Sequence, residues 1–451
     1  MEFESSSVVS SGPRNSLWRL LTVALTALLL ATASIYWAGS ARADEDDGDD
    51  GDSFVPRQVI VQLMGDARIG AINNKYNTRT LEKFPGSKVY LLEDRENRNL
   101  ENLTERIQSD RRVRYAEPNY RTESPEGDPR RMARSVSAPE PSTDPAPFSS
   151  QYALTGALKL SDAHSKTRGK GTVVAVLDTG MQMGHPELRE SITGKRWDFV
   201  DGGDPTDRPD GKDNDGDGVK DEMVGHGTHV AGIVKLAAPQ AKIMPLRVLD
   251  SDGRGNVFVL AEAIRYADRN GADAINLSLG SAGASEFLED VIEDAADKDD
   301  RPAREAVVVA AAGNSNSNEQ HYPAAEEDVL AVTSVNGQLA KSDFANYGAW
   351  VDIAAPGSEI YSTFPTNQYA SWSGTSMSTP FVAGQAALIR SEGQGMGSES
   401  VGCLIRDNAQ PLGDTRLGKG HADAAASLPS NGATCLVNGE AVEDNEGEED
   451  D

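Results

Sequence analysis

The chain has few cysteines, and few basic residues relative to acidic ones. Its 451 residues include two cysteines, Cys403 and Cys435. That number is too small for a disulfide-dense mini-protein, a zinc ribbon or an iron–sulfur protein. Lysine and arginine number 43 against 71 aspartates and glutamates, giving a formal net charge of −28. A chain this acidic is repelled by nucleic acids and by anionic lipid surfaces, so we expect no nucleic-acid partner.

Hydrophobic residues are also scarce, at 38%. Long apolar segments nevertheless remain to build a core, so wholesale disorder is not expected. The charge is unevenly distributed. Residues 57–121 carry 13 basic and 9 acidic side chains, whereas residues 144–438 carry 24 and 41. A small basic segment therefore precedes a large acidic one.

The first 43 residues have the pattern of an export signal. Arg14 and Arg19 precede an uncharged stretch, residues 20–38, and Ala41-Arg42-Ala43 offers the small–any–small sequence that a signal peptidase cuts. We expect a signal peptide at 1–43 and an exported protein, secreted or periplasmic. The stretch is just long enough to span a bilayer, so its retention as a membrane anchor stays open.

A small domain is expected between two linkers. Residues 44–53 are mainly acidic and predict a solvated linker. Residues 54–121 predict a compact domain near the lower size limit for independent stability. Its expected elements are three strands and a helix, at 58–63, 88–92, 113–116 and 99–110. Residues 122–147 are rich in Pro, Ser and Glu, which predicts an exposed, cleavable linker.

Residues 148–436 are expected to form one large domain, followed by an acidic tail at 437–451. The expected strands are 173–178, 243–249, 274–279, 306–312 and 329–335. The expected helices are 227–236, 257–270, 287–298, 375–391 and 399–408. Nearly continuous apolar strands that alternate with helices predict an α/β fold with a doubly wound, buried parallel sheet.

Polar motifs follow the strands, at the edge where α/β sheets bind ligands. The first strand ends in Asp178-Thr179-Gly180. Alone, this motif could be an ordinary turn or half of an aspartic-protease dyad, but no second such motif follows an apolar strand. Further along, His226 and His229 stand three residues apart. A zinc site would need a third ligand, and the Glu of His-Glu-x-x-His is missing, so a structural role is favoured for His229.

A serine, Ser376, stands at the start of an expected helix. Such a serine is usually only a cap, but a helix N-terminus also offers free N–H groups that stabilise an oxyanion. The Gly-x-Ser-x-Gly elbow of α/β-hydrolases is absent at this serine. Pro380 is expected near the first turn, where its missing N–H costs least. Asn314 ends an apolar strand, and its amide could donate to a developing oxyanion.

These motifs are specific in combination. Asp178, His226 and Ser376 follow one another 48 and 150 residues apart, in the chain order of subtilisin. With these motifs the chain resembles the subtilisin-like serine proteases over about residues 151–428. The matching motifs are VVAVLDTG at 173–180, GHGTHVAG at 225–232, NLSLGS at 276–281, AAGNS at 311–315 and SGTSMSTP at 373–380. Residues 57–121 resemble the inhibitory propeptide of this family.

The resemblance implies both a fold and a set of catalytic roles. The fold would be a subtilisin-like domain preceded by a small α+β, ferredoxin-like propeptide domain. Ser376 would be the nucleophile, His226 the general base and Asp178 the partner that orients His226. Asn314 and the N–H of Ser376 would form the oxyanion hole.

The resemblance also implies partners. Protein or peptide substrates would pair with a rim strand at Ser278, Leu279 and Gly280 and, on the opposite side, with Gly253. Residues 54–121 would act as an intramolecular inhibitor, and the mature enzyme would be a monomer.

An acidic segment between Asp178 and His226 predicts a calcium site. Its carboxylates alternate and a glycine stands at position 6, as in the first half of a calcium loop, although Val224 replaces the Glu of position 12. The expected ligands of a structural Ca²⁺ are Asp213, Asp215, Asp217, the carbonyl of Val219, and Asp221. A plain acidic surface turn is the alternative. Against it, carboxylates this close repel one another unless a cation neutralises them.

The combined hypothesis is an exported serine endopeptidase, made as a self-inhibited and autoprocessed precursor. Because export leads to an oxidising compartment and no third cysteine competes, Cys403 and Cys435 are expected to form a disulfide. Two alternatives stay open. The first is a catalytically inactive relative used for binding, against which the intact motifs speak. The second is a calcium-dependent extracellular binding protein, which would need more than one acidic loop.

Overall fold

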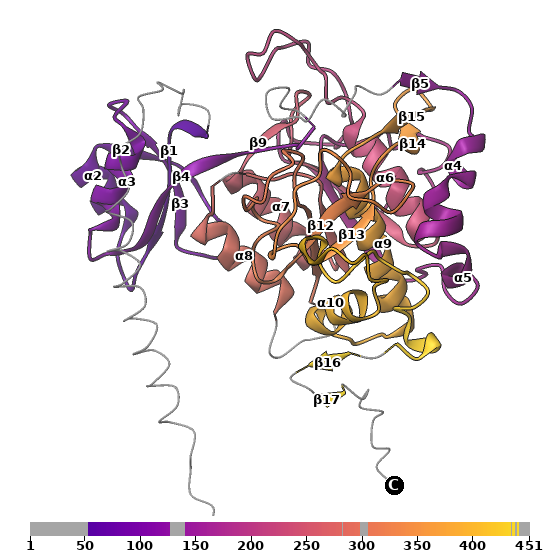
Figure 1. Cartoon of the computed structure of the whole chain (residues 1–451). Coiled ribbons are helices and arrows are strands. Elements are labelled where there is room, and N and C mark those ends of the chain that lie inside the picture. The colour runs from indigo at the N-terminus through magenta and orange to yellow at the C-terminus, as the bar shows by residue number, and fades with distance from the viewer. Residues whose placement is uncertain are drawn as a thin grey trace, which may run out of the picture. The chain divides into compact units, whose positions relative to one another are not determined.

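We describe a computed structural model of the chain (Figure 1). It describes residues 53–126, 140–281, 283–297, 305–433, 435–437 and 440–441. The predicted signal peptide, nearly all of the acidic linker, the middle of the second linker and most of the acidic tail lie outside these residues. None of the helices within the described ranges has the length and apolar character of a membrane span.

The N-terminal domain is an antiparallel sheet with two helices. Its elements in chain order are β1 (Phe54–Leu63), α2 (Ile69–Tyr76), β2 (Thr78–Lys83), β3 (Val89–Asp94), α3 (Leu100–Gln108) and β4 (Val113–Glu123). Helix α2 and strand β2 are not among the predicted elements, for local reasons. Helix α2 has no side-chain N-cap and no acidic residue in its first turn, and most side chains of β2 are exposed, so β2 shows no apolar alternation.

Strand β4 is longer than predicted and runs beyond the expected domain boundary at residue 121. Its last three residues pair with β9 (Arg254–Asn256) of the large domain, giving the strand order β2-β3-β1-β4-β9. Thr122, Ser124 and Glu126 are buried. The prediction of an exposed linker from residue 122 is therefore wrong for its first five residues. Their composition is that of a linker. The residues that they contact come from a remote part of the chain, so the local sequence does not indicate their burial.

The large domain is built on seven strands in the order β13-β12-β11-β10-β6-β8-β7. Every neighbouring pair in this sheet is parallel, which confirms the predicted doubly wound fold. The strands are β6 (Val173–Asp178), β7 (Trp197–Asp198), β8 (Lys242–Arg247), β10 (Ala274–Leu277), β11 (Val307–Ala311), β12 (Val329–Val335) and β13 (Ile353–Pro356).

Helices cover both faces of this sheet. On one face lie α6 (His226–Ala237), α9 (Thr375–Glu392) and α10 (Ser398–Asp407), and on the other α7 (Val257–Arg269) and α8 (Glu286–Ala296). Because successive strand residues point to opposite faces, Val174 and Val176 pack with the first set, and Ala175 and Leu177 with the second. The smaller elements are β5 (Glu140–Ser142), α4 (Ala146–Ser150), α5 (Leu160–His164), β14 (Ile360–Phe364), β15 (Gln368–Trp372), β16 (Leu436–Val437) and β17 (Glu440–Ala441).

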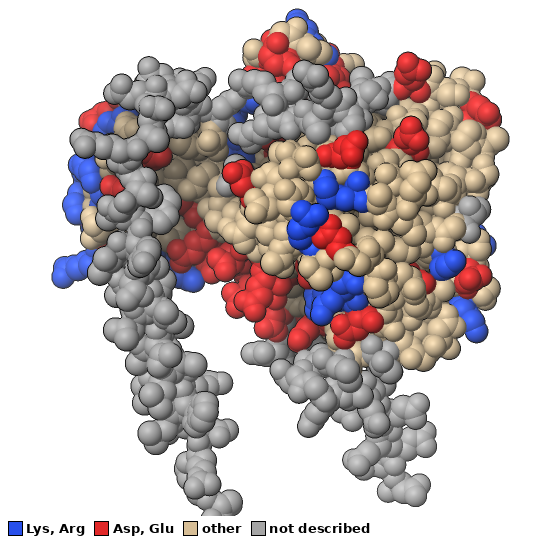
Figure 2. Space-filling model, viewed as in Figure 1, with Lys and Arg blue, Asp and Glu red and all other residues tan. Residues whose placement is uncertain are grey.

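The N-terminal domain contacts α7 and α8 of the large domain. The ring of Phe84 packs edge-on against the rings of Phe258 and Phe287, with centroids 6.1 and 4.9 Å away. Arg114 forms an ion pair with Asp290 at 2.9 Å. Acidic side chains gather around α8 on the surface shown in Figure 2. The basic N-terminal domain thus meets an acidic surface.

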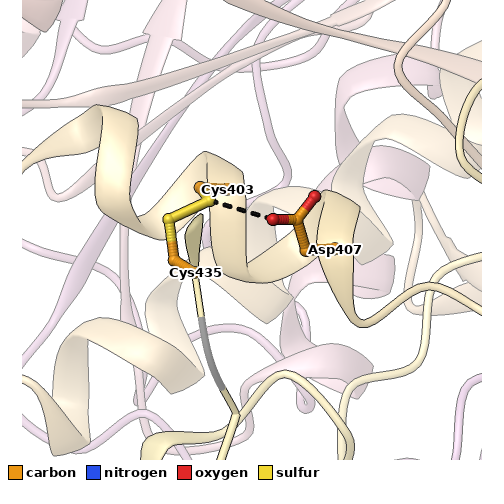
Figure 3. A group of neighbouring side chains, drawn as sticks. All are labelled: Cys403, Asp407 and Cys435. Atoms are coloured by element: carbon orange, nitrogen blue, oxygen red, sulfur yellow. Dashed lines mark hydrogen bonds between the residues drawn. A yellow bond between two sulfur atoms is a disulfide. The ribbon is translucent and has the colours of Figure 1, made fainter. Parts of the chain in front are cut away.

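A disulfide joins helix α10 to the segment near the C-terminal end of the large domain. Cys403 and Cys435 form a disulfide in the structure, with Cα atoms 5.5 Å apart and a sequence separation of 32 (Figure 3). A carboxylate oxygen of Asp407 lies 3.3 Å from the sulfur of Cys403. Because a disulfide sulfur carries no proton and is not a thiolate, this group is neither a hydrogen bond nor a metal site.

Candidate active site

Strand β6 and helix α6 bring Asp178 and His226 together. Asp178 ends β6, His226 begins α6, and both side chains are buried. Nδ1 of His226 lies 2.7 Å from Oδ1 of Asp178, which also accepts the backbone N–H of Thr179. This contact orients the imidazole ring, so that Nε2 faces the centre of the site.

The glycines on either side of His226 are required by close packing. Gly225 has a φ of 104°, and a Cβ there would lie 2.3 Å from the ring of Phe364. A Cβ on Gly227 would lie 2.1 Å from the carbonyl oxygen of Gly180. Only glycine fits at either position, so the motif Gly-His-Gly follows from how tightly α6 enters the site.

The end of β11 and the start of α9 bring Asn314 beside Ser376. The side-chain oxygen of Asn314 accepts hydrogen bonds from the N–H and the hydroxyl of Thr375, at 2.9 and 3.0 Å. Because the oxygen is held there, the amide nitrogen faces the space beside Ser376. Ser376 is the second residue of α9, where the backbone N–H has no partner within the helix.

A carboxylate that we did not predict, that of Glu126, lies between these groups. Its Oε2 accepts a hydrogen bond from the Ser376 hydroxyl at 2.6 Å and lies 3.1 Å from Nε2 of His226. Its Oε1 accepts a hydrogen bond from the amide of Asn314 at 2.8 Å. Ser376 therefore donates to Glu126 and not to His226. Residue 126 lies in the segment predicted to be a linker, and nothing in that segment indicates this contact.

The buried site holds opposite charges. Burial by itself would lower the pKa of His226, but Asp178 and Glu126 outweigh that effect and raise it to about 10. Burial by itself would raise the pKa of Glu126, but hydrogen bonds from His226, Ser376 and Asn314 outweigh it and lower the pKa. Together these effects favour a protonated His226 ring beside an ionised Glu126.

The two predicted rim segments hold the end of β4 between them. Glu123 exchanges both backbone hydrogen bonds with Gly280, at 2.8 and 2.9 Å. The N–H of Ser124 donates to the carbonyl of Gly253 at 2.9 Å. A peptide segment can therefore add as a strand between these rims, as in β-augmentation.

The other two predicted rim residues lie differently. Ser278 lies next to Ser376, since its hydroxyl donates to the carbonyl oxygen of Ser376 at 2.9 Å. Leu279 is fully buried in the hydrophobic cluster that contains α7 and α8. The predicted substrate-binding segment thus contacts residue 123 through Gly280 and Ser376 through Ser278.

A second residue that sequence analysis missed is Asp207. It is buried, and its carboxylate accepts hydrogen bonds from the N–H of Gly225 at 3.0 Å and the hydroxyl of Thr228 at 2.6 Å. Burial raises its pKa to about 6. Asp207 thus holds the start of α6, the helix that carries His226. Asp residues are numerous in this part of the chain, so no local signal distinguishes it.

The acidic loop gathers its carboxylates into two adjoining clusters. One consists of Asp213, Asp215 and Asp252, and the other of Asp215, Asp217 and Glu222, with one ligand atom from each residue within 4.8 Å of the others. Both carboxylate oxygens of Glu222 are buried without a hydrogen-bond partner. Burial, with Asp252, Asp215 and Asp217 nearby, raises the pKa of Glu222 to about 7.

The structure does not place Asp221 in either cluster. Its carboxylate accepts the N–H groups of Asp210 and Gly211 at 2.7 and 3.0 Å. Val219 is exposed, and its N–H donates to Asp217. The predicted ligands Asp213, Asp215 and Asp217 thus lie together, but Glu222 and Asp252 join them instead of Asp221. Asp252 comes from a distant segment, which explains why the loop pattern did not include it.

His229 has the surroundings of a structural histidine. Nε2 of His229 lies 3.1 and 3.0 Å from the carbonyl oxygens of Ile360 and Ala370, and burial lowers its pKa to about 3. His229 is therefore neutral. No candidate metal cluster within the described residues includes a histidine.

Known protein families match both domains. The subtilase family matches residues 169–426, and the fervidolysin N-terminal prodomain matches residues 40–119. Thermitase of Thermoactinomyces vulgaris is 38% identical over 278 residues, which is 59% of this chain and 91% of thermitase. A thermophilic serine proteinase of Bacillus sp. strain AK1 is 36% identical over 364 residues, covering 76% and 80% of the two chains.

Solved structures agree with this assignment. A protease of Pseudoalteromonas arctica superimposes with a TM-score of 0.57 at 30% identity, covering 65% of this chain and 100% of that one. Fervidolysin of Fervidobacterium pennivorans gives a TM-score of 0.67 over 86% of this chain and 62% of its own, and at 22% identity this likeness concerns the fold alone. Because the subtilase match spans more than half of the chain, this protein belongs to the subtilase family of serine endopeptidases and carries an N-terminal prodomain.

Proposed function

We propose that this protein is exported as a self-inhibited precursor and cleaves peptide bonds through Asp178, His226 and Ser376. The observation that supports this best is the contact of three groups with one carboxylate. The Ser376 hydroxyl, the His226 ring and the Asn314 amide all lie within 3.1 Å of the Glu126 carboxylate. That carboxylate marks the place where a substrate carbonyl would sit.

The chemistry follows from these positions once Glu126 has left the site. Ser376 Oγ attacks the carbonyl carbon while Nε2 of His226 takes its proton. Asp178 holds the Nδ1 side of the ring and stabilises the imidazolium that forms. His226 then gives the proton to the leaving amine, and a water molecule hydrolyses the acyl-enzyme by the reverse sequence.

The tetrahedral intermediate needs donors for its oxyanion. The Asn314 amide is held by Thr375 with its nitrogen toward the site, and the Ser376 N–H lies in the first turn of α9. Donors held in place before the reaction stabilise the developing charge without reorganisation. The substrate backbone would pair with Gly280 and Gly253, as residues 123 and 124 do.

Export and processing complete the proposal. The signal pattern at residues 1–43 and the cleavable pattern within 122–147 support a precursor that is exported and then cut. The prodomain, residues 54–121 with the extension to Glu126, would stay on the acidic large domain until it is degraded. The mature enzyme would act as a monomer outside the cytoplasm.

The acidic loop would bind a structural Ca²⁺. Carboxylate oxygens suit this hard cation, and the buried, unpartnered oxygens of Glu222 provide ligands that nothing else satisfies. We propose Asp213, Asp215, Asp217, Glu222 and Asp252 as the residues that would hold it. Bound calcium would tie the loop to Asp252, which directly precedes the rim residue Gly253.

A comparison of two serine variants tests the proposed nucleophile. Ser376→Ala should leave the precursor uncut, and a fluorophosphonate should label neither this precursor nor any product. Ser373→Ala is the matched control, because Ser373 lies three residues away and its hydroxyl instead accepts the N–H of Glu359. It should be processed and labelled like the wild type. Processing of Ser376→Ala at the wild-type rate would disprove the assignment.

A further inference from the structure

The segment that follows β4 enters the active site with the register of a substrate. Glu123 pairs with Gly280 and Ser124 donates to Gly253, so residue 125 comes next opposite Ser278. Hydrogen-bonded positions alternate along an antiparallel pair, and residue 125 would therefore be the next to donate its N–H on the Gly280 side, to the carbonyl of Ser278.

Residue 125 is a proline, which has no N–H to donate. The carbonyl of Ser278 lies instead 3.3 Å from the hydroxyl of Ser376. The segment thus lacks one backbone hydrogen bond where a substrate would be fixed next to the nucleophile. This loss reduces how well the peptide bond that follows residue 125 can be held for attack.

Glu126 then occupies the catalytic centre with its side chain. Its carboxylate is fully enclosed and contacts the hydroxyls of Ser376 and Ser124, the ring of His226 and the amide of Asn314. A Cβ on Gly374 would lie only 1.8 Å from Oε1 of Glu126, so the glycine leaves the space that this carboxylate fills. The Ser376 hydroxyl, the His226 ring and the Asn314 amide are thus engaged by the same side chain.

We propose that Pro125 and Glu126 form a latch that silences the precursor, with Pro125 leaving the backbone unfixed and Glu126 separating the nucleophile from its base. This inference rests on the proposed function, because it assigns Ser376 and His226 their catalytic roles. The Glu126 carboxylate takes the oxyanion position through Asn314 and accepts the hydrogen bond of the Ser376 hydroxyl, which would otherwise be directed at His226. The latch is thus a side-chain carboxylate within an uncut chain, and it needs no cleaved end.

The latch also holds His226 in a charged form that cannot act as a base. Asp178 lies on one side of the ring and Glu126 on the other, while the rings of Trp372 and His229 pack nearby. A cation between two buried carboxylates is strongly favoured over the neutral ring. Removing Glu126 would leave one carboxylate, the arrangement that the catalytic cycle needs.

The test compares full-length precursors with a fluorophosphonate probe, which labels Ser376 only when it is nucleophilic. The variants are Glu126→Ala, the nearly isosteric Glu126→Gln and Pro125→Ala. Glu105→Gln is the control, because Glu105 is an exposed carboxylate on α3, remote in sequence from the latch. The labelling rate of the uncut precursor is measured in the cold before processing begins, with thermal unfolding as a check of folding.

We expect both Glu126 variants to be labelled roughly 10- to 100-fold faster than wild type, the effect of losing one hydrogen bond to a charged group. Pro125→Ala should be processed faster by cleavage after residue 125, and Glu105→Gln should behave as wild type. Equal labelling of wild type and folded Glu126→Gln precursors would overturn the latch. Failure of the probe to label even processed wild-type protein would instead overturn the proposed function.

Discussion

The hydroxyl of Ser278 donates to the carbonyl oxygen of Ser376 at 2.9 Å. In a regular helix this carbonyl would accept the N–H of residue 380, but residue 380 is a proline inside α9. Pro380 lies in the second turn of α9, next to the first turn near which it is expected. The substrate rim therefore satisfies a helix carbonyl that Pro380 leaves free, and connects the rim to the nucleophile.

A double-mutant cycle can measure this connection. Ser278→Ala should cost about 1–3 kcal/mol of stability, because it leaves a buried carbonyl without a partner. Pro380→Ala restores the helical N–H, so the same Ser278→Ala change should cost much less in that background. Chemical denaturation of the four proteins, with Ser376→Ala added to prevent autolysis, gives the coupling free energy. Additive effects would show that Ser278 supports Ser376 in some other way.

The residues of the candidate site could be predicted from the sequence because each stands at the end of a strand or the start of a helix. Asp178 and Asn314 follow apolar strands, and parallel strands present their carboxyl ends at one edge. His226 is the first residue of α6 and Ser376 the second residue of α9, and a glycine is the N-cap of each helix. Local pattern and chain order are therefore sufficient to predict most residues of the candidate site.

The parts that escaped prediction depend on contacts between distant segments. Glu126 meets Ser376 across 250 residues, and its neighbours in sequence are those of a linker. Asp207 is one of many aspartates before α6, and only burial against Thr228 and Gly225 separates it from the others. Asp252 joins the acidic loop from beyond β8. Neither hydrophobic periodicity nor a local motif indicates such contacts between distant segments.

The disulfide between Cys403 and Cys435 is expected to stabilise the protein after export. The bond closes a loop of 32 residues, for which the chain-entropy model gives about 3–4 kcal/mol. Replacing both cysteines with serine should lower the melting temperature and leave activity in the cold unchanged, because neither residue lies near Ser376 in sequence. Reductant should lower the melting temperature of the wild type only. Equal sensitivity of both proteins to reductant would count against a disulfide in the exported protein.

Calcium should stabilise the mature enzyme through the acidic loop. Binding to the folded state alone adds about 2.7 kcal/mol at a concentration 100 times Kd. Chelator should therefore lower the melting temperature of the wild type. Asp215→Ala combined with Asp217→Ala should abolish this response and also raise KM, because Asp252 directly precedes Gly253 in the rim.

Two further variants distinguish the calcium ligands proposed from the carboxylate clusters from those predicted by the loop motif. Glu222→Gln should weaken the chelator response, since Glu222 has two unpartnered oxygens. Asp221→Asn should retain it, because that carboxylate already accepts two backbone N–H groups outside the clusters. The reverse pattern would favour the ligands predicted from the loop motif over those proposed from the carboxylate clusters.

Alkaline pH should release the latch. The pKa of His226 is raised to about 10 by Asp178 and Glu126. At a pH below the pKa that His226 has in the free enzyme, the charged ring therefore stabilises the latched state. This stabilisation is lost progressively as the pH rises toward about 10. The rate of fluorophosphonate labelling of the intact precursor should therefore rise at a higher pH than that of the processed enzyme, in which one of the two carboxylates is gone.

In the Glu126→Gln precursor the midpoint of the labelling rate against pH should shift to lower pH, toward that of the processed enzyme. A midpoint shared by wild type and Glu126→Gln would mean that Glu126 does not hold the proton on His226, since Asp178 is present in both and only the second carboxylate differs.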